Sequence, residues 1–563
     1  MIGELPPALI LILGALLVPL MRGWLRGVYT LALPAVGLIA TLMLDAGVYG
    51  QFQFLGHELT LTRVDSLSRV FAIIFFIAAF ISAVYAWNIR DSLQQTSGLI
   101  YAGAAVGAVF AGDLITLFVY WELTAISSVF LIWASRSEHS YRAGMRYLVV
   151  QIGSGVLLVA GAIVRGAETG SLEFGNIGLD SPGGLLIFLA FGIKCAFPLM
   201  HNWLQDAYPE ATASGTVFLS AFTTKLAVYA LARGYAGTEE LIWIGATMTA
   251  FPIFYAVIEN DLRRVLAYSL NNQLGFMVCG IGIGTELALN GAVSHAFAHI
   301  LYKALLFMSM GAVLYRVGTC NGSELGGLYK SMPITTGMCI VGAASISGFP
   351  LFSGFVTKSM ILTAAAEEHH ILTWFVLLFA SAGVFHHSGI KIPFFAFFAH
   401  DSGKRCAEAP PNMLIAMGIA AFLCIGIGVY PDPLYALLPY PVEYVSYTTT
   451  HVITMLQLLM FSALAFAVLQ RTGLYPPELR STVLDFDWVY RRLGVRAVRD
   501  IAEVLSKSMA ALSAIFLEGL RRTVEWLGDH ASELGVLSRT SHAGTMVSWV
   551  LAVLAGYLVI YFL

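Results

Sequence analysis

The sequence predicts an all-α polytopic membrane protein with about sixteen transmembrane helices. Hydrophobic residues make up 58% of the 563-residue chain and charged residues only 12%, whereas soluble proteins carry about 25% charged residues. Mean hydropathy is +0.78. Apolar runs of about twenty residues, long enough to cross a bilayer as helices, recur along the whole chain. The lipid bilayer is therefore the first expected partner, and a net charge of −3 gives no support for a nucleic-acid partner.

The apolar runs define the expected helices. They lie at 7–22, 27–48, 67–87, 97–112, 113–133, 144–165, 183–208, 213–233, 239–258, 264–284, 289–315, 335–365, 371–398, 412–430, 448–470 and 545–563. No basic segment precedes the first run, so we interpret it as a spanning helix and not as a cleaved signal peptide.

Basic residues between the runs indicate the orientation in the membrane. The connections after odd-numbered runs carry Arg22, Arg26, Arg90, Arg136, Arg142, Arg263, Arg264, Arg316, Lys330, Lys404 and Arg405. The connections after even-numbered runs carry Arg63, Arg165 and Arg233 before the last long loop. Loops rich in Lys and Arg stay in the cytoplasm. We therefore expect a protein of the bacterial inner (plasma) membrane with both termini on the outer, periplasmic side.

The run at 183–208 has the features of a broken helix. Lys194 lies inside it, and Pro198 follows four residues later. A charged group at membrane depth costs about 2.5–3.5 kcal/mol on insertion scales, so a buried lysine indicates function. A proline breaks the helical hydrogen bonds, which is tolerated at this depth only beside protein or water. We expect a titratable amine in a hydrated cavity, and a second buried lysine, Lys225, in the next run.

A second broken helix is expected in the run at 335–365. Its helix breaks, its lysine and the lysine of the following run are Gly348, Pro350, Gly354, Lys358 and Lys391. Broken helices in corresponding places suggest inverted repeats in transporters, so we predict two inverted five-helix repeats, each with a broken helix. The predicted divisions are 1–96 for N-terminal transmembrane helices, 97–233 and 239–398 for the two repeats, 412–470 for two further helices, 471–544 for a cytoplasmic amphipathic segment and 545–563 for the last helix.

One acid, Glu122, lies in the middle of the run at 113–133. A carboxylate inside a spanning helix normally pairs with a base, and Lys194 and Lys225 are the candidates. The alternative is an ion pair that only holds helices together.

Three titratable residues share one face of the run at 289–315. His295, His299 and Lys303 are spaced four residues apart, which places them on one side of a helix. This pattern favours a proton relay. No carboxylate or cysteine joins the two histidines, so a metal site is the weaker interpretation.

These residues together predict a buried axis of proton carriers. Its members are Glu122, Lys194, Lys225, His295, His299, Lys303, Lys358 and Lys391. A pathway for Na⁺ or K⁺ would need oxygen ligands, whereas this set is mostly basic, so we expect it to carry protons. The cysteines are scattered singly and form no metal-binding motif, and we expect no cofactor.

The segment 471–544 is the only long polar stretch. Apolar residues recur there at three- and four-residue steps from Val498 to Leu527, which predicts an amphipathic helix. We expect it to lie on the cytoplasmic side, along the membrane or a neighbouring subunit. A solvated helix without a partner is the alternative.

Several segments together resemble the antiporter-like membrane subunits shared by Mrp-type Na⁺/H⁺ antiporters, respiratory complex I and membrane-bound hydrogenases. Over about residues 60–400 they are DSLSRVF, FVYWEL, IKCAFPLMHNWLQDAYPEA, NDLRRVLAYSLNNQLGFM, HAFAHILYKALLFMSMGAVLY and SISGFPLFSGFVTK. Within that group, LYKALLFMSMGAVL, HHSGIKIPFF and YPDPLYALLPYPVEY look most like the D-type subunit of the Mrp-type antiporters.

The resemblance implies a role for each matching residue. The roles are the essential glutamate for Glu122, its partner lysine for Lys194, the next lysine for Lys225, the central relay for His299 with Lys303, and the exit-side lysine for Lys358. The chain departs from the family pattern at Gln205 and at Ala211–Thr212, which touches none of the buried groups. Family members bind no cofactor and work inside multi-subunit complexes.

The sequence therefore predicts a proton-translocating subunit of a multi-subunit Mrp-type monovalent cation (Na⁺)/proton antiporter, and not an enzyme. The expected partners are the other membrane subunits of that complex, H⁺ and Na⁺. One alternative is a proton-pumping subunit of a complex I-like, membrane-bound hydrogenase or bicarbonate-uptake complex. Another is a membrane scaffold that transports nothing.

Overall fold

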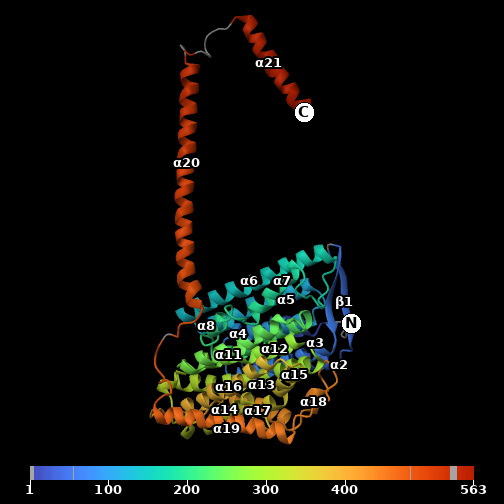
Figure 1. The fold of residues 1–563 in the computed structure, drawn as a ribbon, viewed down its shortest axis with the longest axis vertical. Coiled ribbons are helices and arrows are strands. Elements are labelled where there is room, and N and C mark those ends of the chain that lie inside the picture. Colours follow the sequence, from blue (N-terminus) through green and yellow to red (C-terminus); the bar gives the residue numbers. More distant parts are fainter. Residues whose placement is uncertain (1–5, 55, 482, 533–534, 536–541, 563) are drawn as a thin grey trace. The chain divides into compact units, whose positions relative to one another are not determined.

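The computed structural model describes residues 6–54, 56–481, 483–532, 535 and 542–562. The chain divides into two compact units, Met1–Val483 and Leu484–Leu563. The helices of the first unit lie side by side as a bundle, and both candidate broken helices belong to it (Figure 1).

The first unit contains nearly all of the helices. Its first part consists of α1 (Pro7–Ala15), the 3₁₀ turn η2 (Val18–Leu20), α2 (Gly23–Met43), β1 (Gly47–Phe54), β2 (His57–Val64), α3 (Ser66–Tyr85), α4 (Ser92–Phe110), α5 (Leu114–Trp133), α6 (Glu138–Thr169), α7 (Pro182–Lys194), α8 (Asn202–Ala207), α9 (Gly215–Ala221) and α10 (Thr223–Gly234). Its second part consists of α11 (Glu240–Ile258), α12 (Leu262–Ile283), α13 (Glu286–Val317), the turns η3 (Gly322–Glu324) and η4 (Leu328–Lys330), α14 (Pro333–Ser347), α15 (Ser353–Glu367), α16 (Ile371–Val384), the π-helical η5 (Phe385–Lys391) and η6 (Phe394–Phe398), α17 (Pro411–Val429), α18 (Asp432–Tyr435) and α19 (Thr449–Thr472).

The predicted membrane fold is confirmed. Among the described residues, 11 helices are long and apolar enough to cross a bilayer, and three shorter apolar helices accompany them. Each predicted apolar run falls on a helix or on an interrupted helix. The number of sixteen spans remains a prediction, because several of these segments are short or less apolar than a complete span.

Side chains of the loops begin the helices that carry the site. Asp113 caps α5: its carboxylate accepts hydrogen bonds from the backbone N–H groups of Ile115 and Thr116, at 2.9 and 2.7 Å. Ser181 caps α7 in the same way, and Pro182 follows at the first helical position. These caps set the register with which α5 and α7 enter the bundle.

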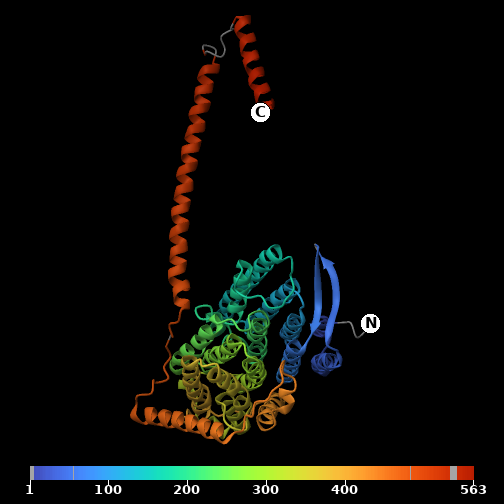
Figure 2. The same ribbon diagram turned by 45° about the vertical axis from the view of Figure 1, so that its right-hand side comes forward.

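A β-hairpin is the one element of the first unit that the all-α prediction missed. Strands β1 and β2 pair antiparallel, from Gly47 opposite Val64 to Phe54 opposite His57, and stand at one edge of the bundle (Figure 2). The alternation of polar and apolar residues in β2 is typical of a half-buried strand and explains the hairpin.

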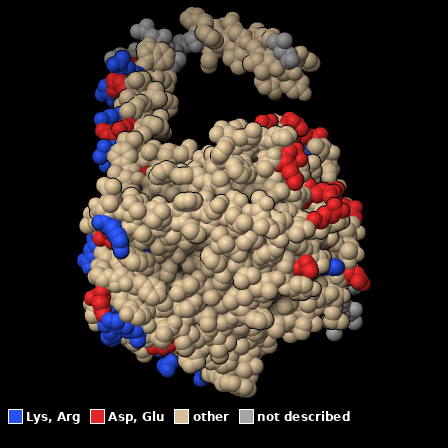
Figure 3. Space-filling model, turned by 60° about the horizontal axis from the view of Figure 1, so that its bottom comes forward, with Lys and Arg blue, Asp and Glu red and all other residues tan. Residues whose placement is uncertain are grey.

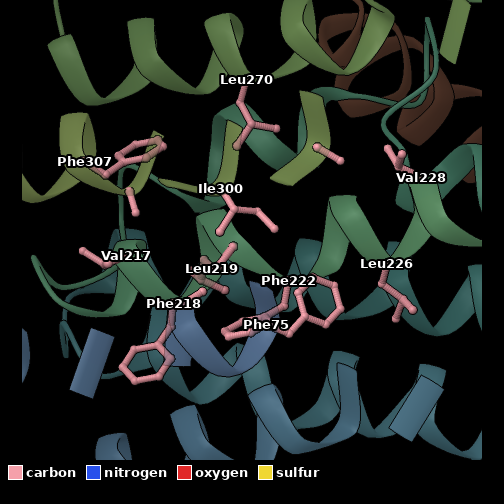
Figure 4. Close-up of a cluster of buried hydrophobic side chains, with 14 of the residues drawn as sticks. Phe75, Val217, Phe218, Leu219, Phe222, Leu226, Val228, Leu270, Ile300 and Phe307 are labelled. Atoms are coloured by element: carbon pink, nitrogen blue, oxygen red, sulfur yellow. The ribbon is translucent and has the colours of Figure 1, made fainter. Parts of the chain in front are cut away.

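The core lies around the interrupted helix pair α9–α10. Figure 4 shows Phe222 and Leu226 between side chains of α3 and α13, among them Phe75 and Ile300. The rings of Phe75 and Phe222 meet edge to face with their centroids 5.4 Å apart. The packing therefore surrounds Lys225, one residue before Leu226, with apolar side chains.

The surface of the bundle has the composition of a protein in a bilayer. On the face drawn in Figure 3, Lys, Arg, Asp and Glu gather toward opposite edges and leave a broad area almost without charge between them. Large hydrophobic side chains such as Phe254, Phe375 and Phe422 are exposed. This chain is a multi-pass membrane protein.

The second unit contains the π-helical turn η7 (Val489–Gly494), α20 (Val495–Ala531) and α21 (Ala543–Phe562). The predicted amphipathic stripe from Val498 to Leu527 lies entirely within α20, so its helical character is confirmed. Helix α21 is one of the helices apolar enough to span a membrane. The cytoplasmic position of the 471–544 segment remains a prediction.

Candidate proton-transfer site

Lys194 lies where the first broken helix stops. It is the last residue of α7, has no exposed surface, and donates hydrogen bonds to the Trp121 carbonyl and to Oγ1 of Thr124, both at 2.7 Å. Its Nζ also stands 4.3 Å from the centre of the Trp121 ring. The carbonyl end of a helix favours a cation, so the end of α7 and the side of α5 together hold this amine.

Glu122 lies beside Lys194 on α5. Its charge interacts electrostatically with that of Lys194, as predicted. Its buried oxygen Oε1 has no hydrogen-bond partner among the described residues. An unpartnered carboxylate oxygen next to a buried amine leaves a position for a proton or a water molecule.

Lys225 lies at a second interruption, between α9 and α10. It is fully buried, and its Nζ donates a hydrogen bond of 2.6 Å to the carbonyl of Ser220. The charge of Lys225 reaches both His299 and Lys303 on α13. Lys225 therefore connects the first half of the bundle to the central helix.

The three predicted relay residues of α13 have different surroundings. His295 contacts Oγ1 of Thr357 and Oε1 of Gln273, each at 3.1 Å. Both ring nitrogens of His299 and the amine of Lys303 lack hydrogen-bond partners in the described part of the chain. Three buried polar side chains on one helix, two of them unpartnered, are expected in a path that holds water or protons.

From α13 the buried groups divide into two branches. On one branch His295 contacts Thr357 and interacts electrostatically with Lys358 of α15. The amine of Lys358 has no hydrogen-bond partner among the described residues and stands 5.3 Å from the ring centre of Phe276.

The other branch enters the π-helical segment η5. The charge of Lys303 reaches His387, whose Nδ1 lies 2.9 Å from Oγ of Ser388. Four residues after His387, Lys391 donates to the carbonyls of Val257 and Glu259, at 2.6 and 2.7 Å. A π-helix often marks a functional site because its extra residue changes which side chains face a cavity.

A carboxylate that the sequence did not indicate ends this second branch. Oε1 of Glu478 pairs with Nζ of Lys391 at 2.9 Å, and both side chains are almost fully buried. Burial raises the pKa of Glu478, and the nearby charge of Lys391 opposes this increase. Glu478 lies in a polar loop after α19, so only the expectation that every buried lysine needs a counter-charge could have found it.

The two breaks have the same backbone, and one shared tripeptide marks them. Phe-Pro-Leu occurs at 197–199 and at 349–351, and the leucine has a positive φ in both copies, 70° at Leu199 and 75° at Leu351. The residue before each tripeptide, Ala196 or Gly348, is also left-handed, with φ of 61° and 74°. This likeness supports the predicted pairing of the two broken helices.

One predicted break residue has another role. Pro198, Gly348 and Pro350 lie in the interrupted segments, but Gly354 lies in the first turn of α15. A Cβ at Gly354 would overlap the carbonyl oxygen of Ser345. Gly354 therefore permits the close approach of α14 and α15 and does not break the helix.

The structure brings all eight predicted proton-transfer residues into the interior of one unit, but not in a single line. The sequence suggested a path from Lys194 through Lys225 and the α13 relay to Lys358. Lys391 instead belongs to a separate branch with Glu478. Within the described residues, no group of three His, Cys, Asp or Glu side chains is placed to hold a metal ion.

Comparison with known proteins places this geometry in a family. Residues 111–424 match the model described as "NADH:quinone oxidoreductase/Mrp antiporter, TM". The D-type subunit of the Na(+)/H(+) antiporter of Alkalihalophilus pseudofirmus is 32% identical over 355 residues, which cover 58% of this chain and 71% of the relative. In two other curated relatives the match spans 62% and 41% of the relative's length. The predicted resemblance is confirmed.

Two solved structures share the fold. One is a chain of the Mrp complex from Dietzia sp. DQ12-45-1b, with 20% identity, a TM-score of 0.71, and coverage of 83% of this chain and 99% of that chain. The other belongs to the membrane-bound sulfane sulfur reductase, an archaeal respiratory membrane complex, with 23% identity, a TM-score of 0.72, and coverage of 99% and 100%.

Proposed function

Because the chain belongs to the NADH:quinone oxidoreductase/Mrp antiporter transmembrane family, we propose that it is the proton-translocating subunit of a multi-subunit Mrp-type Na⁺/H⁺ antiporter. The observation that carries this proposal is the buried axis of amines and imidazoles, several of them unpartnered, with Glu122 at one end and Glu478 at the other. Relatives named as D-type subunits of Na(+)/H(+) antiporters support the Mrp assignment.

A proton would enter from one side of the membrane and load Lys194. Movement of the Glu122 carboxylate toward or away from this amine changes the stability of its protonated form, and so gates release. The proton would then pass by way of Lys225 to His299 and Lys303. From there it leaves along the Lys358 branch or along the Lys391 branch.

Orientation follows from the loop charges. Both termini lie on the outer side of the inner membrane in this proposal, and the basic loops lie in the cytoplasm. The other subunits of the complex provide the pathway for Na⁺, because the axis in this chain is mostly basic.

A second candidate is a proton-pumping subunit of a redox-driven membrane complex. The sulfane sulfur reductase chain matches nearly the whole length of this protein, including the part that contains α20 and α21. Such a complex would move protons when electrons flow, and not in exchange for Na⁺.

Antiport in membrane vesicles tests the proposal. Vesicles that contain the complete complex should dissipate an imposed pH gradient when Na⁺ or K⁺ is added. Either Glu122→Ala or Lys194→Ala should abolish this exchange while the complex still assembles, as judged by co-purification of its subunits. Wild-type exchange in either variant would refute the mechanism, and proton movement driven only by an electron donor would favour the second candidate.

A further inference from the structure

Gly155 of α6 occupies a special position next to Glu122. A Cβ built on this glycine would overlap Oε1 of Glu122, and would lie 2.5 Å from its Cδ and 3.1 Å from its Cγ. Real Cβ atoms do not approach other atoms so closely. The Glu122 carboxylate therefore rests in the space that the missing side chain of Gly155 leaves open.

The surrounding helices are fixed, so they cannot easily move to enlarge this space. Nε1 of Trp121, the residue before Glu122, donates to Oγ of Ser154 at 3.0 Å. The same hydroxyl donates to the carbonyl of Ala190 on α7 at 2.7 Å. These bonds hold α5, α6 and α7 together at the level of Gly155. A side chain added at Gly155 must therefore displace the side chain of Glu122.

We propose that Gly155 is a positioning residue that keeps the Glu122 carboxylate in its resting place against α6. With a methyl group at this position, the carboxylate moves, and its electrostatic interaction with Lys194 changes. The effect of Gly155 on transport rests on the proposed function, but its effect on the place of Glu122 does not.

Two other glycines of α6 provide matched controls. A Cβ on Gly153 would meet no atom within 4 Å. A Cβ on Gly161 would lie 2.7 Å from Cγ1 of Ile187 and 2.8 Å from the Gly183 carbonyl oxygen, so its nearest neighbours belong to α7 and not to Glu122. Gly161 therefore represents a glycine that serves helix packing alone.

A thermal-stability cycle on the purified complete complex tests the contact directly. Gly155→Ala should lower the Tm in the wild-type background but not in the Glu122→Ala background, because the clash needs the Glu122 side chain. Gly161→Ala should lower the Tm equally in both backgrounds, and Gly153→Ala in neither. Equal destabilisation by Gly155→Ala in both backgrounds would overturn the proposal. If Gly155→Ala prevents assembly, restored assembly in the double variant supports it, and continued failure overturns it.

Antiport tests the consequence for transport. Gly155→Ala should lower the exchange rate about tenfold or more, and Gly153→Ala should leave it unchanged. Combining Gly155→Ala with Glu122→Asp, whose side chain is one methylene shorter, should restore part of the rate relative to Gly155→Ala alone. Wild-type exchange and an unchanged pH profile in Gly155→Ala would overturn the positioning role even if the proposed function holds.

Discussion

The broken helix α7–α8 and the broken helix α14–α15 present their lysines in the same way but surround them differently. Lys194 ends α7, and the amine of Lys358 lies close to Gly348, the residue that ends α14. Each amine therefore stands at the negative end of a half-helix. Lys194 has two hydrogen bonds and Glu122 beside it, whereas Lys358 has no hydrogen-bond partner among the described residues.

This difference shows that the repeated backbone does not by itself specify the role of its lysine. In the first half the carboxylate acts on the lysine of the break. In the second half the carboxylate, Glu478, pairs instead with Lys391, outside the break. The first break is thus suited to controlled loading of a proton, and the second to passing it on.

Arginine substitutions should have the largest effect on this comparison. Arginine keeps the positive charge but does not release its proton, so Lys194→Arg and Lys358→Arg should each reduce antiport to the background of vesicles without the complex. Antiport in vesicles and co-purification of the subunits are the measurements. Activity above half of wild type in Lys358→Arg would mean that the second break supplies only a fixed charge, and the two lysines would then have unlike roles.

Glu478→Gln should have an intermediate effect, confined to the second half. Lys391 keeps its two carbonyl acceptors but loses a charged partner, a change of about 1.5–3 kcal/mol for a hydrogen bond to a charged group. We expect antiport to decrease several-fold, whereas Glu503→Gln, an exposed control in α20, should leave it unchanged. An activity equal to wild type would show that the Lys391 branch carries no protons.

The stability of the same variant should also depend on pH. Because the pKa of Glu478 is raised in the fold, the folded chain binds more protons than the unfolded chain, and this group loses stabilising effect as pH rises above its ordinary value of 4.5. Glutamine cannot titrate. The Tm of the wild-type complex should therefore fall relative to that of Glu478→Gln as pH is raised through this window, and a constant difference would contradict the shift.

Glycine at the two left-handed leucines should have the smallest effect. A positive φ costs a residue other than glycine about 1–2 kcal/mol, and glycine in turn loses about 0.5–1 kcal/mol through its flexible unfolded chain. Leu199→Gly and Leu351→Gly should therefore change the Tm by only a few degrees, and in the same direction. The alanine variants at both positions keep the strain and serve as controls. Opposite responses at Leu199 and Leu351 would show that the two breaks are not equivalent.

Much of the fold and most of the candidate site could be predicted from individual residues. A lysine or histidine inside a long apolar run stands out, because burying a charge in a membrane has a high free-energy cost, and this rule identified Lys194, Lys225, His299 and Lys358. The same rule could not identify Glu478, because a glutamate in a polar loop is ordinary. The shared Phe-Pro-Leu tripeptide was a readable signal for the paired breaks.

The membrane fold, the family and the set of buried titratable residues were all legible in the amino-acid sequence. They follow from local length, hydropathy and motif, which the bilayer constrains at every span. Helix packing, in contrast, determines which carboxylate reaches which lysine, where the axis divides after α13, and how Gly155 makes room for Glu122. Those contacts join residues far apart in the chain, and they depend on how the helices pack, which no local pattern records.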